Sequence, residues 1–413
     1  MDEDPVRRQY EAYPYPRRDP AEESKRLITG SPSNLVELNH YLFAGRRDFA
    51  KPFRALVAGG GTGDGAIMLA QQLADRGGPG EVVYLDLSDA ARQVAEARAQ
   101  VRGLTNLTFL TGSILDLPDL GLGRFDYVDC CGVLHHLDDP PAGLAALATM
   151  VAEDGGLGVM VYGVYGRTGV YPAQAMLRQL GEGLSLGDRV VQARRLLAAL
   201  PPSNWLKLNQ LVGDHERSDA ELVDLLLHPR DRAYSVPQVV ALARGAGLEP
   251  VAFLDPALYQ PATYLKDPAL LRALEPLDWL EQAAFAERLA GVMKTHCCYL
   301  AKGPGATERI ARPEGSDSVP VAPQMSGPAL AKALGKTLTL KIDLAGTKLR
   351  LPVPRLAPAI LKRIDGKTSL GMIHQSLAAA DPSLDWPSFQ ARFDQLYRPL
   401  NGFGFLLIAN PLD

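Results

Sequence analysis

The sequence predicts an α/β protein built on a doubly wound, mostly parallel sheet, with a small α+β domain after it. Three observations support this class. An apolar run passes through a glycine turn into helix-forming residues at 53–70, FRALVAGGGTGDGAIMLA. The next apolar run, EVVYLDLS, ends in an acidic residue, Asp86. Strand-like and helix-like runs then alternate to about residue 162, a pattern typical of parallel strands joined by helices.

The glycine turn predicts a nucleotide site. Glycine adopts positive φ without strain and lets a ligand approach the backbone, beside the amides of a helix N-terminus. Gly61, Gly63 and Ala66 match the G-x-G-x-x-A fingerprint of dinucleotide-binding folds. Gly59, together with the same two glycines, matches the G-x-G-x-G loop of enzymes that use S-adenosylmethionine. Both patterns expect an acidic residue at the end of the next strand, where Asp86 stands.

The order of the later motifs decides between the two patterns. A helix-like run at 90–101 precedes the strand NLTFL, the loop TGSILDLP, the strand RFDYVDCCG, the turn VLHHLDDP and the strand EDGGLGVMVY. From Phe53 to about Tyr162 the chain therefore resembles the class I S-adenosylmethionine-dependent methyltransferases. The resemblance implies a seven-stranded Rossmann-like sheet and S-adenosylmethionine as the cofactor. A nicotinamide enzyme has little support, because no hydride-transfer site is evident.

The resemblance also implies which residues bind the cofactor. The glycines would lie against its methionyl part, Asp86 would bind the ribose hydroxyls and Leu87 would pack on the adenine. At the adenine rim, Ser113 and Ile114 stand where the family usually has an acidic residue followed by an apolar one. Only Ser113 departs from this pattern, and a serine makes the weaker, neutral hydrogen bond. The full set of expected contacts is Gly59, Gly60, Gly61, Gly63, Asp86, Leu87, Ser113, Ile114, Cys131 and Gly132.

Three residues are candidates for catalysis: His136, Tyr10 and Tyr15. An imidazole titrates near neutral pH and can take a proton from an incoming nucleophile. The other role for His136 and its neighbour His135, and the one we expect, is to hold the turn after the fourth strand. A metal site is not expected, because adjacent histidines rarely converge on one ion and displacement at a sulfonium needs no metal.

The amino-terminal segment, residues 1–52, carries the motif QYEAYPYPR at 9–17. Its prolines predict an extended segment rather than a long helix. We expect it to close over the site, where the rings and hydroxyls of Tyr10 and Tyr15 can face a sulfonium or an amine. The alternative is a segment that only packs on the domain surface. The motif resembles the QYExxPYPR segment of a bacterial methyltransferase group often fused to tetratricopeptide repeats, although no repeat is visible here.

The rest of the chain is expected to form further segments. Residues 53–302 make the methyltransferase domain, in which an insertion at 163–233 supplies a substrate lid or a dimer element. The motifs DLLLH and YSVP in this region also resemble the tetratricopeptide-linked group. A composition rich in Gly, Pro and Ser predicts a linker at 303–329. Residues 330–413 begin with a hairpin pattern, TLTLKIDLAGTKLRLPV, and continue with helices, an order that loosely resembles winged-helix domains.

Composition and charge weigh against several classes. The 413 residues carry a formal charge of −4 and a pI near 6.0, which gives no electrostatic case for nucleic acid. No apolar stretch reaches the roughly 18 residues of a membrane helix, and the start, MDEDPVRRQY, lacks the apolar core of a signal peptide. The four cysteines form two vicinal pairs, whose members point to opposite faces of a strand. We therefore expect free thiols in a cytoplasmic protein.

Three functions remain open. The extra carboxyl-terminal domain and a looser resemblance to multi-domain bacterial protein-lysine methyltransferases favour an enzyme that methylates a protein or peptide side chain. The second is a methyltransferase for a small metabolite, in which the carboxyl-terminal domain makes a homodimer. The third is a cofactor-binding scaffold without turnover, for which Ser113 is the hint.

Overall fold

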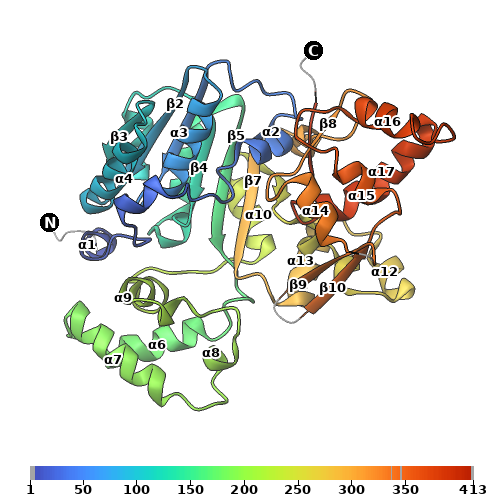
Figure 1. The fold of residues 1–413 in the computed structure, drawn as a ribbon. Coiled ribbons are helices and arrows are strands. Elements are labelled where there is room, and N and C mark those ends of the chain that lie inside the picture. The colour runs from blue at the N-terminus through green and yellow to red at the C-terminus, as the bar shows by residue number, and fades with distance from the viewer. Residues whose placement is uncertain (1–4, 336, 345–346, 411–413) are drawn as a thin grey trace. The chain divides into compact units, whose positions relative to one another are not determined.

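A seven-stranded sheet in the order β3-β2-β1-β4-β5-β7-β6 is the largest element of the fold (Figure 1). The computed structural model describes residues 5–335, 337–344 and 347–410. Strands β1 to β5 pair in parallel, and β7 runs antiparallel to β5. The predicted methyltransferase-type sheet is thereby confirmed. Its strands are β1 (Phe53–Ala58), β2 (Gly80–Asp86), β3 (Leu107–Thr111), β4 (Phe125–Cys131), β5 (Val151–Tyr162), β6 (Leu248–Phe253) and β7 (Thr295–Lys302).

The direction of the connections decides which face of the sheet each helix covers. β1, β2 and β3 follow one another toward one edge, whereas β4 and β5 proceed toward the other. Because such crossovers are right-handed, α3 (Asp64–Asp75) and α4 (Asp89–Arg102) cover one face and α5 (Pro140–Met150) covers the other. The strand order reverses between β1 and β4, which opens a crevice at their carboxyl ends.

The central strands are buried on both faces, which explains their nearly continuous apolar sequences. In β1 the run from Ala55 to Ala58 is at most 3% exposed. Cys130 in β4 and Cys298 in β7 are buried, and neither forms a disulfide. Burial raises the pKa of the Cys130 and Cys298 thiols, so these thiols are poor nucleophiles at neutral pH.

The chain divides into two compact units. The first consists of Met1–Ser33, Phe49–Glu249 and Ala290–Lys302. The second consists of Asn34–Asp48, Pro250–Leu289 and Gly303–Asp413. This division departs from the expected segments, because α2 (Leu35–Leu42), from the expected amino-terminal cap, belongs to the second unit. There the Ile408 amide donates to Nδ1 of the fully buried His40 at 3.1 Å, and burial lowers the pKa of His40 to about 4.

The amino-terminal segment is not extended throughout. Residues Pro5–Ala12 form α1, which includes the first half of the QYEAYPYPR motif. The expectation of an extended segment was wrong here, because the first proline stands at the start of the helix, where it is tolerated, and the next comes only at Pro14. From Tyr13 to Arg17 the chain leaves the helix, as the two prolines of that stretch predict.

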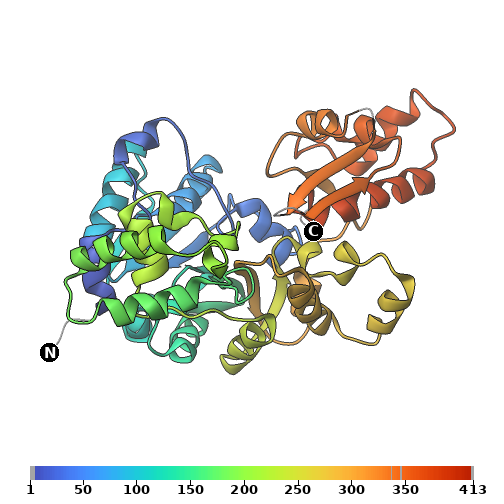
Figure 2. The same ribbon diagram turned by 90° about the horizontal axis from the view of Figure 1, so that it is seen from below.

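The insertion after β5 is helical and has a small core of its own. Figure 2 shows α6 and α7 side by side in green. Tyr13 of the amino-terminal segment packs against this core. A short α-helix, Asp219–Leu222, continues as a π-helical turn, Val223–Leu227, a feature frequent at functional sites. The insertion helices are α6 (Val170–Leu180), α7 (Leu186–Ala199), α8 (Trp205–Leu208) and α9 (Asp219–Leu222), and α10 (Val236–Gly245) precedes β6.

The second unit contains small sheets and helices around a separate apolar core. The predicted hairpin is confirmed: β9 (Thr339–Leu344) pairs antiparallel with β10 (Thr347–Pro352). The expected linker holds β8 (Val319–Val321), a strand too short to show alternation, which pairs with β11 (Leu407–Ala409). The winged-helix assignment stays a prediction. The main helices of this region are α12 (Pro268–Leu274), α13 (Trp279–Ala290), α14 (Gly327–Ala333), α15 (Ala357–Leu361), α16 (Leu370–Ala378) and α17 (Trp386–Asn401).

Within the described part of the chain, every helix is too short or too polar to span a membrane.

Candidate active site

A cavity of about 550 Å³ lies in the first unit, at the carboxyl ends of β1 and β4. The structure brings together all but one of the predicted site residues here. The exception is Gly63, which is the N-cap of α3 and does not line the cavity. The predicted residues that line it are Tyr10, Tyr15, Gly59, Gly60, Gly61, Asp86, Leu87, Ser113, Ile114, Cys131, Gly132 and His136.

The glycine turn has the backbone geometry that its sequence predicts. Gly59, Gly61 and Gly63 have φ values of +78°, +52° and +101°, which non-glycine residues adopt only with strain. A Cβ at Gly61 would lie 2.6 Å from the Tyr15 carbonyl oxygen, and a Cβ at Gly60 would lie 2.3 Å from the ring of Tyr84. The turn therefore packs this closely against its neighbours only because Gly60 and Gly61 have no side chains.

Asp86 is held by backbone amides at the end of β2. Its carboxylate accepts from the Gly61 amide at 2.7 Å and from the Ser88 amide at 2.8 Å. Burial raises the pKa of Asp86, and these amide bonds oppose the rise. The same bonds tie the carboxylate to the glycine turn. We call Gly59, Gly60, Gly61 and Asp86, which the sequence predicts to contact the cofactor, the cofactor wall.

Ser113 has a structural task that explains why a serine stands there. Its hydroxyl accepts from the Leu115 amide at 3.2 Å and caps the 3-10 helix Ile114–Asp119. Serine is among the preferred N-cap residues. Ser113 and the buried Ile114 both line the cavity, so the cap and the rim of the cavity coincide.

A buried carboxylate, Asp224, lies on another part of the cavity surface. It belongs to the π-helical turn of the insertion and is 5% exposed. The hydroxyl of Tyr10 donates to its Oδ1 at 3.2 Å, and that of Tyr162 donates to its Oδ2 at 3.1 Å. Burial raises the pKa of Asp224, whereas His136 and the two hydroxyls oppose the rise. We call Tyr10, His136, Tyr162 and Asp224 the insertion wall.

His136 is fixed by contacts on several sides. Its Nδ1 lies 2.8 Å from the Arg230 carbonyl oxygen, so this nitrogen carries the proton and Nε2 is the acceptor in the neutral ring. The ring stacks on His228 at 3.7 Å and meets Tyr162 edge-on at 5.7 Å. His135 is fully buried away from the cavity, and burial lowers its pKa well below the ordinary value. Of the pair, only His136 lines the cavity.

Sequence reasoning missed several residues of the cavity. We assigned no role to Asp224, the first residue of the DLLLH motif. The apolar residues that follow it were a signal that its carboxylate could be buried. Arg167 lines the cavity, pairs with Asp231 at 2.9 Å and places its guanidinium 3.6 Å from the ring centre of Tyr162. No pattern in the sequence indicated that contact, because the two partners meet only through the fold of the insertion.

Asp129 in β4 was also missed. It accepts from the Ser33 hydroxyl at 2.6 Å and from the Tyr127 hydroxyl at 3.2 Å, and it lines the cavity. Burial raises its pKa to about 6, against these bonds. Among the residues that the structure describes, no three His, Cys, Asp or Glu side chains are grouped so as to hold a metal ion.

Comparisons with known proteins agree with this geometry. Residues 56–157, which run from β1 into β5, match a family model described as a methyltransferase domain. An uncharacterized protein of Synechococcus is 31% identical over 270 residues, which are 61% of this chain and 60% of that protein. The ubiquinone biosynthesis O-methyltransferase of Alkalilimnicola ehrlichii is 34% identical over 93 residues, 22% of this chain and 36% of that enzyme.

Among solved structures, PKMT2 from Rickettsia typhi in complex with AdoHcy is similar in fold. The TM-score is 0.65 at 16% identity, and the alignment covers 92% of this chain and 76% of that chain. This chain therefore has the α/β methyltransferase fold, and residues 56–157 carry its methyltransferase domain signature.

Proposed function

We propose that the protein is an S-adenosylmethionine-dependent methyltransferase that methylates an amine on a protein or peptide side chain. One observation carries the proposal: a single cavity combines two chemically different walls. The cofactor wall offers bare backbone and a carboxylate, Asp86. The insertion wall offers a second carboxylate, Asp224, between two tyrosine hydroxyls. An adenosyl sulfonium suits the first wall, and a cationic nucleophile suits the second.

The residues of the cofactor wall fit S-adenosylmethionine. Gly59, Gly60 and Gly61 line the cavity without side chains, and Asp86 can accept from two ribose hydroxyls. Leu87 and Ile114 add apolar surface for the adenine. When bound, the cofactor supplies a methyl group on a sulfonium that is already a good leaving group. The chain therefore has to align the nucleophile, exclude water and remove a proton.

The insertion wall favours a cationic amine as the group to be methylated. Burial raises the pKa of Tyr10 and Tyr162, so both remain neutral donors that hold the Asp224 carboxylate in place. A fixed carboxylate in a buried site attracts an ammonium strongly, whereas a neutral hydroxyl substrate gains much less. An alcohol or a phenol would not need a buried carboxylate for binding, so the charge of Asp224 supports an amine as the substrate.

We assign proton removal to His136, in place of the turn-holding role that we expected from the sequence, because its ring lines the cavity. An ammonium has no lone pair and must lose a proton before it attacks. The contact of Nδ1 with the Arg230 carbonyl leaves Nε2 as the acceptor, and the ring lines the cavity. His136→Asn is expected to lower kcat roughly 10²- to 10⁴-fold with a normal melting temperature. Turnover within tenfold of the wild type would assign His136 to holding the turn.

A small-molecule methyltransferase is the second candidate. The likeness to an O-methyltransferase of ubiquinone biosynthesis favours it, although that likeness covers only 22% of this chain. This chain also spans only about 60% of the length of the uncharacterized Synechococcus relative.

Methyl-labelled S-adenosylmethionine tests the proposal. The protein is incubated with the label and a bacterial lysate, and protein and small-molecule fractions are counted and analysed by mass spectrometry. Label on amines of macromolecules is expected. Label only in small molecules favours the second candidate. Calorimetric binding of the cofactor without any labelling indicates a scaffold and contradicts the proposal.

A further inference from the structure

We infer that Arg98 is a positioning residue that fixes the cofactor wall and the amino-terminal segment relative to each other. This inference rests on the proposed function, because the turn that Arg98 holds is the turn assigned to the cofactor. Arg98 lies on α4 and does not itself line the cavity, although its hydrogen-bond partner Asp64 does. No sequence motif indicated a role for Arg98.

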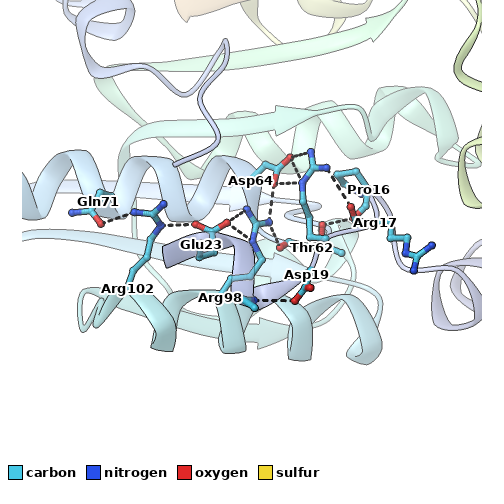
Figure 3. Close-up of polar contacts among 11 residues, drawn as sticks. Pro16, Arg17, Asp19, Glu23, Thr62, Asp64, Gln71, Arg98 and Arg102 are labelled. Atoms are coloured by element: carbon cyan, nitrogen blue, oxygen red, sulfur yellow. Dashed lines mark hydrogen bonds and ion pairs between the residues drawn. The ribbon is translucent and has the colours of Figure 1, made fainter. Parts of the chain in front are cut away.

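Arg98 reaches from α4 to the glycine turn and hydrogen-bonds to it. Its Nη1 donates to the Thr62 carbonyl oxygen at 2.6 Å and to Asp64 Oδ1 at 2.7 Å (Figure 3). Thr62 follows Gly61 in the turn, and Asp64 is the first residue of α3. The Arg98 side chain is 1% exposed. Its bond to Thr62 is buried and its bond to Asp64 is partly buried, and both fix the turn against α4.

The other edge of the same guanidinium binds the amino-terminal segment. Nε and Nη2 of Arg98 donate to Glu23 Oε1 at 2.7 and 2.5 Å. Glu23 is also buried, with a side chain 3% exposed, and its Oε2 accepts from Arg102 at 2.5 Å. The planar fork of an arginine suits this double contact, which a lysine cannot reproduce. Figure 3 shows the row of alternating charges that results.

The glycine turn also holds the part of the amino-terminal segment that lines the cavity. The Thr62 amide and hydroxyl donate to the carbonyl oxygens of Tyr15 and Pro16, at 3.3 and 2.7 Å. Arg18 adds a bond to Asp64 at 2.6 Å. One connected set of bonds therefore runs from Glu23 through Arg98 to Thr62, and from Thr62 to the residues on either side of the Tyr15–Pro16 bond.

The arrangement is better explained by positioning than by stability. A buried ion pair is weak evidence for stability, since apolar residues of similar volume often serve as well or better. The bonds of Arg98 instead join a backbone carbonyl of the glycine turn to a side chain of another segment. Among the described residues, removing them leaves only the bonds of Thr62 and Arg18 between the turn and the segment, so both can shift, and small displacements near a reacting group are costly.

A pair of variants separates the two explanations. Arg98→Met alone leaves Glu23 with only Arg102 and can destabilise the fold. The double variant Glu23→Met/Arg98→Met replaces the buried pair by apolar side chains and is expected to melt near the wild-type temperature. Its affinity for AdoHcy, measured by calorimetry, is expected to fall about 10- to 100-fold, with KM for S-adenosylmethionine raised more than kcat is lowered. Trypsin is expected to cleave the amino-terminal segment faster, a readout that needs no ligand.

Two further variants complete the test. Arg98→Lys keeps the charge but not the fork, and its AdoHcy affinity is expected to fall between those of the double variant and the wild type. Arg124→Met, which removes an exposed partner of Glu153 before β4, is the matched control and is expected to leave every readout unchanged. A double variant with wild-type melting, affinity and cleavage overturns the inference alone. Absence of AdoHcy binding by the wild type overturns the proposed cofactor, and the inference with it.

Discussion

The cofactor wall and the insertion wall differ in how the chain builds them. The cofactor wall comes from a turn of consecutive residues and from the end of the next strand, and its shape is a property of the backbone. The insertion wall consists of four side chains from separate segments, which meet at Asp224. Changes in the cofactor wall should therefore affect mainly cofactor affinity, whereas changes in the insertion wall should affect mainly turnover.

Removal of residues 1–16 is expected to have the largest effect, because it takes Tyr10 and Tyr15 out of the cavity together. Methyl transfer should fall below detection and cofactor binding should weaken, while circular dichroism shows a folded sheet, since β1 begins only at Phe53. The truncated protein keeps Glu23 and its contact with Arg98, so an effect of the truncation cannot come from the loss of that contact. Normal binding and turnover would mean that this segment only packs on the surface, and that the lid lies in the insertion at 163–233.

Asp224→Asn is expected to have the second-largest effect, and it should act on turnover rather than on cofactor affinity. It keeps the shape of the side chain but removes the charge that attracts an ammonium, so kcat/KM for the amine substrate should fall by about 2–5 kcal/mol, roughly 30- to 5000-fold. Affinity for S-adenosylmethionine should stay within about twofold of the wild type. Asp188→Asn, at an exposed position of the insertion, is the control. A kcat/KM equal to that of the control would remove the basis for an amine substrate.

Asp129 predicts a pH dependence of stability. Its pKa is about 6 in the folded protein and about 3.9 in an unfolded chain. A raised folded pKa gives stability that is complete below about pH 4 and is lost as pH rises through about 6, for a total of about 3 kcal/mol. Urea unfolding of Asp129→Asn from pH 4 to 7 should lack this part of the decline. Parallel pH profiles of the variant and the wild type would mean that Asp129 ionises at an ordinary pH.

Ser113→Asp should have the smallest effect. The resemblance places an acidic residue at this position, and aspartate can also cap the 3-10 helix. A charge-assisted bond to the adenine amine in place of a neutral one should improve S-adenosylmethionine affinity by about 1 kcal/mol, roughly fivefold. Calorimetry measures this directly. Weaker binding would show that the serine is preferred in this cavity and would remove the hint of a scaffold.

The sequence predicted the cofactor wall better than the insertion wall for a physical reason. Positive φ at a tight turn nearly requires glycine, so the turn is visible in the residues themselves. Asp86, the last residue of the second strand, was expected because both nucleotide-binding patterns place an acidic residue there. Gly63 shows the limit of this reasoning, because the glycine fits the pattern but caps α3 and packs against Ala95 rather than lining the cavity.

The insertion wall depends on contacts between distant segments, which no local pattern encodes. Tyr10 was a candidate, yet its partner Asp224 lies 214 positions later in the chain. Arg98 and Glu23 are 75 positions apart, and each alone resembles an ordinary charged residue of a solvated helix. Such pairs become visible only when the fold brings them together.

The central claim is that the two walls bind different partners in one cavity, and calorimetric titration of AdoHcy into Asp86→Ala and Asp224→Asn tests it most directly. Asp86 should make two charge-assisted bonds to the ribose, so its loss should weaken binding by about 2–3 kcal/mol, roughly 30- to 150-fold. Asp224→Asn should bind AdoHcy as the wild type does. Equal affinities in the wild type and Asp86→Ala, or an equal loss in both variants, would contradict the assignment of the two walls.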